Sequence, residues 1–259
     1  MDLSSFLICS DFDGTFADSN GKIPQENIEA IRRFQSLGGM FTFATGRSPE
    51  FVRNLGQLDL HPNAPVITVN GSLLYDQVHD KELIKHPVRE VPSELIRRLS
   101  TLELYNNTRL VYEDLTDEYF WKGDNERLFA AVKRGIMKAV FVYDDADFTD
   151  ALSYELRQRY GERLNFARSW PFSLEMLDSR SSKGALLNEL KALCPKVRTV
   201  IGIGDFDNDV SLLQSADIGV AVANAQPVVK DAADVVLDRS NDEAAIARLI
   251  GMLEAGALK

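Results

Sequence analysis

Short apolar runs alternate with segments of helical periodicity at both ends of the chain. The first run, residues 6–9, is apolar at every position, as in a strand that is covered on both faces. In the next segment, residues 24–36, Ile28, Ile31 and Phe34 recur on one helical face. A strand followed by a helix is the unit of a parallel sheet, so this end of the chain is predicted to begin an α/β domain.

The alternation continues beyond this first pair. Strands are expected at residues 40–44, 66–69, 73–75, 199–203, 218–222 and 235–237. Helices are expected from residue 49 and at residues 183–193, 210–215, 227–233 and 242–253. The simplest architecture is a doubly wound parallel sheet that is built from both ends of the chain.

The pattern changes between these two halves. Helix-like periodicity at residues 91–102 and 151–160 is mixed with strand-like runs at residues 139–143, 164–167 and 174–177. We therefore predict a parallel-sheet domain formed by residues 1–82 and 179–259, interrupted by a separate α+β unit at residues 83–178.

Composition narrows the class of partner. The chain has 259 residues, and its net charge of −10 argues against nucleic acid or an anionic membrane as its main partner. No apolar stretch approaches the ~18 residues of a membrane span, and no basic segment precedes the first apolar run, so a cytoplasmic protein is expected. Cys9 and Cys194 are too few for a disulfide framework, and both are expected to be reduced. The oligomeric state stays open.

Two aspartates, Asp11 and Asp13, directly follow the first predicted strand. Ligands of open α/β sheets bind outside the carboxyl ends of the strands, which places both carboxylates at an expected site. Because the two charges repel each other, both groups ionise readily only beside a metal ion or a lysine. For this stretch alone, a plain turn with a helix cap is the alternative.

Two further strand ends carry polar residues that suit phosphate or metal chemistry. Thr45 ends the strand at residues 40–44 and faces the start of a helix, which is a favourable place for a phosphate group. Asp205 and Asp209 follow the strand at residues 199–203 and offer the oxygen ligands that Mg²⁺ prefers. Three such endings at one edge of a sheet predict a common site.

Lys183 is expected at the start of a helix, where the helix dipole disfavours a cation unless an anion lies nearby. The four aspartates carry −4, and Mg²⁺ with Lys183 returns +3, so the site is near neutral when Asp13 is protonated. A phosphate group could then be bound by Lys183, the Thr45 hydroxyl and backbone amides. A surface lysine is the alternative for Lys183 alone.

Four motifs resemble those of the haloacid dehalogenase-like (HAD) phosphatases. They are Asp11-Phe-Asp13-Gly-Thr15, Thr45-Gly46-Arg47, Lys183-Gly184 and Gly204-Asp205-Phe-Asp-Asn208-Asp209. The long insert, together with Asn70-Gly71 and residues 219–225, resembles the Cof-like subfamily (type IIB) with its α/β cap. The resemblance implies a HAD core with a Rossmann-like fold at residues 1–82 and 179–259 and a substrate-specifying cap at residues 83–178.

The resemblance also implies roles for the motif residues. Asp11 would be the nucleophile that forms an aspartyl-phosphate, and Asp13 the acid and base. Thr45 and Lys183 would complete the catalytic set. The implied substrate-binding residues are Phe12, Thr45, Gly46, Arg47, Lys183 and Asn208, and the implied Mg²⁺ ligands are the Asp11 carboxylate, the Asp13 backbone carbonyl, Asp205 and Asp209, the last directly or through water.

The implied function is an Mg²⁺-dependent phosphatase that hydrolyses a small phosphorylated metabolite, such as a sugar phosphate, a nucleotide or a phosphorylated cofactor. Because Asp13 follows Asp11 at the second position, phosphate esters are favoured over the carbon–halogen bonds that dehalogenases of the superfamily cleave. A phosphomutase with the same residues, a phospho-accepting signalling protein and a non-catalytic interaction protein are the alternatives.

Overall fold

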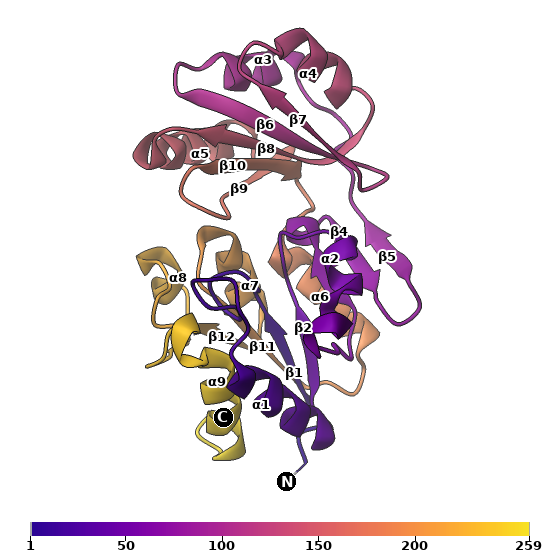
Figure 1. Cartoon of the computed structure of the whole chain (residues 1–259), viewed down its shortest axis with the longest axis vertical. Coiled ribbons are helices and arrows are strands. Elements are labelled where there is room, and N and C mark those ends of the chain that lie inside the picture. Colours follow the sequence, from indigo (N-terminus) through magenta and orange to yellow (C-terminus); the bar gives the residue numbers. More distant parts are fainter. Residues whose placement is uncertain (1, 259) are drawn as a thin grey trace. The chain divides into compact units, whose positions relative to one another are not determined.

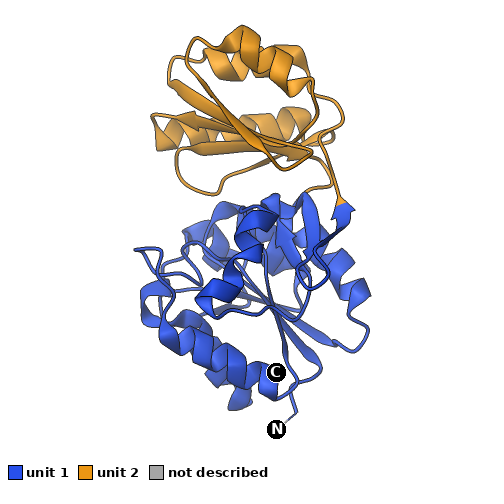
Figure 2. Cartoon of the chain, turned by 45° about the vertical axis from the view of Figure 1, so that its right-hand side comes forward, with its two compact units in different colours: residues 1–84, 182–259 blue, residues 85–181 orange. Residues whose placement is uncertain are grey.

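The computed structural model describes residues 2–258, and the chain divides into two compact units (Figures 1 and 2). Residues 1–84 and 182–259 form the first unit, and residues 85–181 form the second. Figure 2 colours the first unit blue and the second orange. The second unit is therefore an insertion in the sequence of the first.

The first unit contains a sheet of five parallel strands in the order β13-β12-β11-β1-β2. The strands are β1 (Phe6–Ser10), β2 (Met40–Phe43), β11 (Thr199–Gly204), β12 (Ile218–Ala221) and β13 (Val235–Val236). Strand β1 lies between β2 and β11, so the two ends of the chain share one sheet. Its Leu7, Ile8 and Cys9 have no exposed surface, as the continuous apolar run predicts.

Helices cover both faces of this sheet (Figure 1). Helix α1 (Gln25–Ser36) packs against α9 (Ala245–Glu254) on one face, and α6 (Lys183–Leu193) packs against α7 (Val210–Ser215) on the other. The shorter helical segments are α2 (Pro49–Arg53), α8 (Pro227–Asp231), η1 (Leu55–Leu58), η2 (Val69–Gly71), η3 (Asp207–Asp209) and η4 (Asn241–Glu243). The predicted doubly wound parallel sheet is confirmed.

A small second sheet extends this unit next to β2. Its strands are β3 (Val66–Thr68), β4 (Leu73–Asp76) and β5 (Lys81–Lys85), and β3 and β4 pair antiparallel. A parallel bridge between Ala44 and Ile67 joins β3 to the chain just after β2. The strands predicted at residues 66–69 and 73–75 therefore form a hairpin, and its turn, η2, lies at the carboxyl end of β3.

The second unit is an α+β fold, as predicted. Its antiparallel sheet has the order β7-β6-β8-β10-β9. The strands are β6 (Tyr105–Tyr112), β7 (Asp117–Trp121), β8 (Ile136–Tyr143), β9 (Leu164–Ala167) and β10 (Ser173–Asp178), and the helices are α3 (Ser93–Thr101), α4 (Asn125–Val132) and α5 (Ala146–Tyr160). The helices bury Leu95, Leu128 and Leu156 in a core with Phe141 and Phe166 of the sheet. Helix α4 and the β6–β7 hairpin were not predicted.

Among residues 2–258, no helix combines the length and the apolar character needed to cross a membrane. Cys9 and Cys194 are both buried free thiols.

Candidate active site

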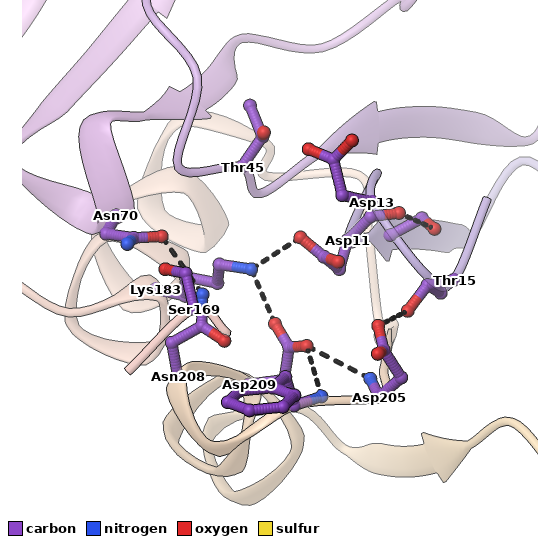
Figure 3. A network of polar contacts seen from close by, with 12 residues as sticks. Asp11, Asp13, Thr15, Thr45, Asn70, Ser169, Lys183, Asp205, Asn208 and Asp209 are labelled. Carbon is purple, nitrogen blue, oxygen red and sulfur yellow. Dashed lines mark hydrogen bonds and ion pairs between the residues drawn. The ribbon is translucent and has the colours of Figure 1, made fainter. Parts of the chain in front are cut away.

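Lys183 joins two of the predicted aspartates at the carboxyl edge of the parallel sheet. Its Nζ donates to Oδ1 of Asp11 and to Oδ1 of Asp209, each 2.6 Å away (Figure 3). The side chains of Lys183 and Asp209 have no exposed surface, and that of Asp11 is 9% exposed. Lys183 is therefore a buried partner of two carboxylates, and the alternative of a surface lysine is wrong.

The start of helix α6 places this lysine. The Ser182 side chain accepts a hydrogen bond from the Ala185 backbone N, 3.0 Å away, and so caps the helix that begins at Lys183. A cation in the first turn opposes the helix dipole. The carboxylates of Asp11 and Asp209 supply the anions that the sequence led us to expect beside it.

Asp209 closes the loop that follows β11. Its Oδ2 accepts from the backbone N atoms of Asp205 and Phe206, at 3.0 and 3.1 Å, while its Oδ1 accepts from Lys183. At Gly204, a Cβ atom would collide with the Asp209 side chain, so this carboxylate needs the glycine that precedes Asp205. Three donors thus hold Asp209 in place.

Asp205 is held from the other side by the segment after β1. Its Oδ1 accepts from Thr15 Oγ1 at 2.5 Å. A Cβ at Gly14, where φ is +80°, would lie 2.6 Å from Asp205 Oδ2. One carboxylate oxygen from each of Asp11, Asp205 and Asp209 lies within 4.8 Å of the others. The chain therefore gathers three hard oxygen donors at one point, which is the donor type that Mg²⁺ prefers.

The charges of this cluster are not balanced by Lys183 alone. Burial raises the pKa of the Asp11 carboxyl well above its usual range, and the charge of Asp209 raises it further. Burial and the same neighbour raise the pKa of Asp205 to about 7. Burial by itself would lower the pKa of the Lys183 ammonium, but Asp11 and Asp209 raise it above its ordinary value. A divalent cation would favour the ionised carboxylates, so these residues fit Mg²⁺.

Asp13 lies in a more exposed part of the site, where it pairs with Arg47. Arg47 Nε donates to Asp13 Oδ2 at 2.8 Å, and Arg47 Nη2 donates to Oδ1 at 2.5 Å. The guanidinium also lies over the rings of Phe12 and Phe51, 5.0 and 4.2 Å from their centroids. Phe12 is only 2% exposed, and its place in the substrate-binding set stays a prediction.

Thr45 continues the line of β2 toward the site. Its backbone N donates to Ile67 O at 2.8 Å, which ties it to β3, and its Oγ1 accepts from the Arg47 backbone N at 3.1 Å. Thr45 is 1% exposed. In Figure 3, Thr45, Asp13 and Lys183 are drawn around Asp11.

Asn70, which was not among the predicted site residues, lies next to both Gly46 and Asn208. Asn208 Nδ2 donates to Asn70 Oδ1 at 3.1 Å, and a Cβ at Gly46 would lie 3.1 Å from the same oxygen. Asn70 and Thr15 are therefore two site neighbours for which the sequence predicted no role. The signal for Thr15 was its place in the first motif, and the signal for Asn70 was the Asn-Gly pair after a strand.

Together, the fold and the site define an α/β enzyme with an acidic cluster and a buried lysine at the carboxyl edge of a parallel sheet. A model of the haloacid dehalogenase-like hydrolase family matches residues 8–250. The chain belongs to this family.

Two relatives of the chain are named as phosphatases. It is 28% identical over 250 residues to the 5-amino-6-(5-phospho-D-ribitylamino)uracil phosphatase YcsE of Bacillus subtilis, covering 96% of each chain. It is 24% identical over 272 residues to the pyridoxal phosphate phosphatase YbhA of Escherichia coli, covering 94% of this chain and 97% of the relative. The predicted resemblance and the predicted enzyme class, a HAD-type phosphatase, are confirmed.

A solved structure supports the fold. The HAD subclass IIB sugar phosphatase BT4131 superposes with a TM-score of 0.78 at 21% identity, over 97% of this chain and 99% of that one. This likeness extends across both compact units and confirms the fold class, a Rossmann-like core with an inserted cap.

Proposed function

We propose that this chain is an Mg²⁺-dependent phosphatase that hydrolyses small phosphorylated metabolites through an aspartyl-phosphate on Asp11. The observation that carries the proposal is the convergence of Asp11, Lys183, Asp205 and Asp209, which come from distant parts of the sequence. A buried lysine on one side of Asp11 and carboxylate oxygens on the other suit a group that must attack a phosphate dianion.

In the first step, an Asp11 carboxylate oxygen attacks phosphorus in line with the leaving group. The bond between phosphorus and the leaving oxygen breaks, and Asp13 gives its proton to that oxygen. The Lys183 ammonium, the Thr45 hydroxyl and the backbone at Gly46 would stabilise the charge on the other phosphoryl oxygens. Asn208 would contact this group or orient Lys183.

In the second step, Asp13 accepts a proton from a water molecule, whose oxygen attacks phosphorus. The bond between Asp11 and phosphorus breaks, which releases inorganic phosphate and restores both carboxyl groups. With 57% of its side chain exposed, Asp13 is well placed to meet both the leaving oxygen and water.

The Asp11 carboxylate, the Asp13 backbone carbonyl, Asp205 and Asp209 would hold the metal ion. When bound, Mg²⁺ supplies positive charge that offsets the acidic cluster and the phosphoryl oxygens. Asp209 already accepts from Lys183 and from two backbone amides, so Asp11 and Asp205 are the carboxylates with more freedom to serve as direct ligands.

For the substrate, we propose a small phosphorylated metabolite and assign its recognition to the inserted unit as a cap. YcsE and YbhA act, by their names, on a ribitylaminouracil phosphate and on pyridoxal phosphate, and BT4131 is a sugar phosphatase. A panel of these three ester types with Mg²⁺ present and absent would rank the candidates. One ester with a clearly higher kcat/KM would name the substrate class, and equal rates on all would argue against a selective cap.

The variant Asp11→Asn tests the chemistry, because it removes the nucleophile with little change in volume. We expect release of inorganic phosphate from p-nitrophenyl phosphate to fall to the background rate while the circular dichroism spectrum is unchanged. Asp147→Asn, which makes the same change at an exposed position on α5, is the matched control and should keep wild-type turnover.

Product analysis with a sugar phosphate, which offers a second hydroxyl, separates the alternatives. Transfer to a second hydroxyl without free phosphate would indicate a phosphomutase, and a stable phospho-aspartate without turnover would indicate a signalling protein. Wild-type turnover in Asp11→Asn would refute the assignment of the nucleophile.

A further inference from the structure

The turn between β3 and β4 has an unusual backbone. Three consecutive residues are left-handed: Val69 with φ 52°, Asn70 with φ 53° and Gly71 with φ 87°. Asparagine and glycine accept this conformation readily, but a β-branched residue such as Val69 does so only against a steric cost. Two left-handed residues suffice to close a tight hairpin. The turn is therefore more constrained than the connection of two strands requires, and strain of this kind gathers at functional sites.

One side of the turn holds the segment that carries Thr45. The backbone N of Val69 donates to Arg47 O, and the backbone N of Asn70 donates to Thr45 O, both at 3.0 Å. The Asn70 side chain lies over Gly46, where an added Cβ would come within 3.1 Å of its Oδ1. The turn thus fixes the backbone of the proposed phosphate-binding segment at two points.

The other side of the turn meets the remaining two motifs. Asn70 Oδ1 accepts from Asn208 Nδ2 at 3.1 Å. An added Cβ at Gly71 would collide with the carbonyl oxygen of Ser182 and lie 2.8 Å from the backbone N of Lys183. The turn therefore packs directly against the start of α6, with no space for a side chain between them.

We propose that Asn70 is a positioning residue of the reaction centre, which holds the Asn208 amide and the Thr45–Arg47 segment in register around the phosphoryl group. This inference rests on the proposed phosphatase function and adds a residue to it. Asn70 is 2% exposed, so its amide acts inside the protein rather than on bulk solvent. Because one left-handed turn contacts the Thr45, Lys183 and Asn208 segments, a small displacement there would move several donors at once.

A purely structural reading of Asn70 makes a different prediction. If the residue is present only because asparagine tolerates a positive φ, glycine should replace it without loss, since glycine adopts φ 53° at no steric cost. Asn70→Gly keeps the turn and removes only the amide. Asp59→Gly is a matched control, because Asp59 is also left-handed, with φ 59°, and lies at the exposed end of η1.

We expect Asn70→Gly to lower kcat for p-nitrophenyl phosphate about 10- to 100-fold, the scale of a small misplacement of catalytic groups, with KM changed less than about threefold. Asp59→Gly should keep wild-type kcat. In the background of Asn208→Ala, adding Asn70→Gly should cause less than about a threefold further loss, because the two residues act as one unit. Thermal unfolding of each variant is measured in parallel.

Several results would overturn the inference. Wild-type kcat in Asn70→Gly would leave only the structural reading, and a loss confined to KM would make Asn70 a ground-state ligand. If the double variant lost kcat by the product of the two single losses, Asn70 would act independently of Asn208. A kcat loss that merely follows a lowered melting temperature would be a stability effect. If wild type is active and Asp11→Asn is not, each of these outcomes overturns the inference while the proposed function stands.

Discussion

Asp11 and Asp13 are separated by one residue, yet they lie in opposite environments. Asp11 is 9% exposed and pairs with a lysine that has no exposed surface, whereas Asp13 is 57% exposed and pairs with a half-exposed arginine. Phe12 lies between them in the sequence, and its ring is buried among other aromatic rings. One short motif thus supplies a buried side and an exposed side of the same site.

The two ion pairs should therefore differ in what they do. Two charges that are buried together have lost their hydration, so removing one of them leaves the other uncompensated. An exposed pair gains little, because water and salt screen it and the long side chains lose freedom. The buried side is suited to fix the proposed nucleophile, and the exposed side is suited to the proposed acid and base, which would exchange protons with water and substrate.

The largest difference should appear on removing Lys183. Lys183→Met leaves Asp11 and Asp209 buried side by side without their cation, and we expect a loss of about 3–5 kcal/mol in the free energy of unfolding and at least a 100-fold loss of kcat. Chemical denaturation and phosphate release measure the two effects. Lys191→Met is the matched control on the same helix, since Lys191 pairs with Asp217 at 2.9 Å with 31% and 41% exposure, and it should cost at most about 1 kcal/mol. Equal losses for both lysines would contradict the comparison.

The second prediction concerns Mg²⁺ on the buried side. Chelation of divalent ions should abolish turnover, and added Mg²⁺ should raise the melting temperature of the apo protein, because an ion that binds only the folded state stabilises it. Asp205→Asn should remove most of this thermal shift, since Asp205 is one of the three clustered carboxylates. An undiminished shift in that variant would place the ion elsewhere in the chain.

The third prediction is that the rise in melting temperature caused by Mg²⁺ depends on pH. Burial holds the folded-state pKa of Asp205 at about 7 and that of Asp11 well above 3.8, its ordinary value. Between pH 4 and about 7 the folded protein therefore keeps protons that the unfolded chain has released, so the contribution of these groups to stability falls as the pH rises. Mg²⁺ bound to these carboxylates would replace those protons.

The thermal shift caused by Mg²⁺ should therefore be larger at pH 7.5 than at pH 5.5, where the ion must compete with protons. Melting curves at one Mg²⁺ concentration and both pH values check this, with the apo protein at each pH as the reference. A shift that is equal or larger at pH 5.5 would show that Asp11 and Asp205 are ionised in the apo protein at that pH.

The placement of the buried carboxylates could be predicted from the sequence, because the parallel sheet brings the ends of its strands to one edge. Once residues 6–9 and 199–203 are predicted as strands, the topology brings Asp11 and Asp205 to one edge. The partners of each carboxylate could not be predicted in this way. Thr15 and Asn70 take part through contacts across 190 and 138 residues, and nothing in their local sequence specifies those partners.

The elements that were misplaced have local causes. Helix α9 begins at Ala245 rather than at residue 242, because Ala244 is left-handed with φ 57° and separates it from the η4 turn. The turn between β6 and β7 contains neither glycine nor proline, and Leu115 takes the left-handed position with φ 68°, so the usual hairpin signal was missing. Helix α5 begins five residues earlier than predicted, capped by the Asp145 side chain, which accepts from the Phe148 backbone N at 2.7 Å.

The smallest effect should come from the exposed side. Arg47→Ala should change the free energy of unfolding by less than about 1 kcal/mol, because both side chains of its pair with Asp13 are well exposed. Arg53→Ala is a close match, since Arg53 also pairs with an exposed aspartate, Asp80, and lies 5.4 Å from the centroid of Tyr75. Both variants should keep nearly the same stability, but only Arg47→Ala should lower kcat/KM, by about 10-fold, because Arg47 holds the proposed acid and base. A similar loss of activity in both variants would mean that the exposed arginines act through the fold and not through Asp13.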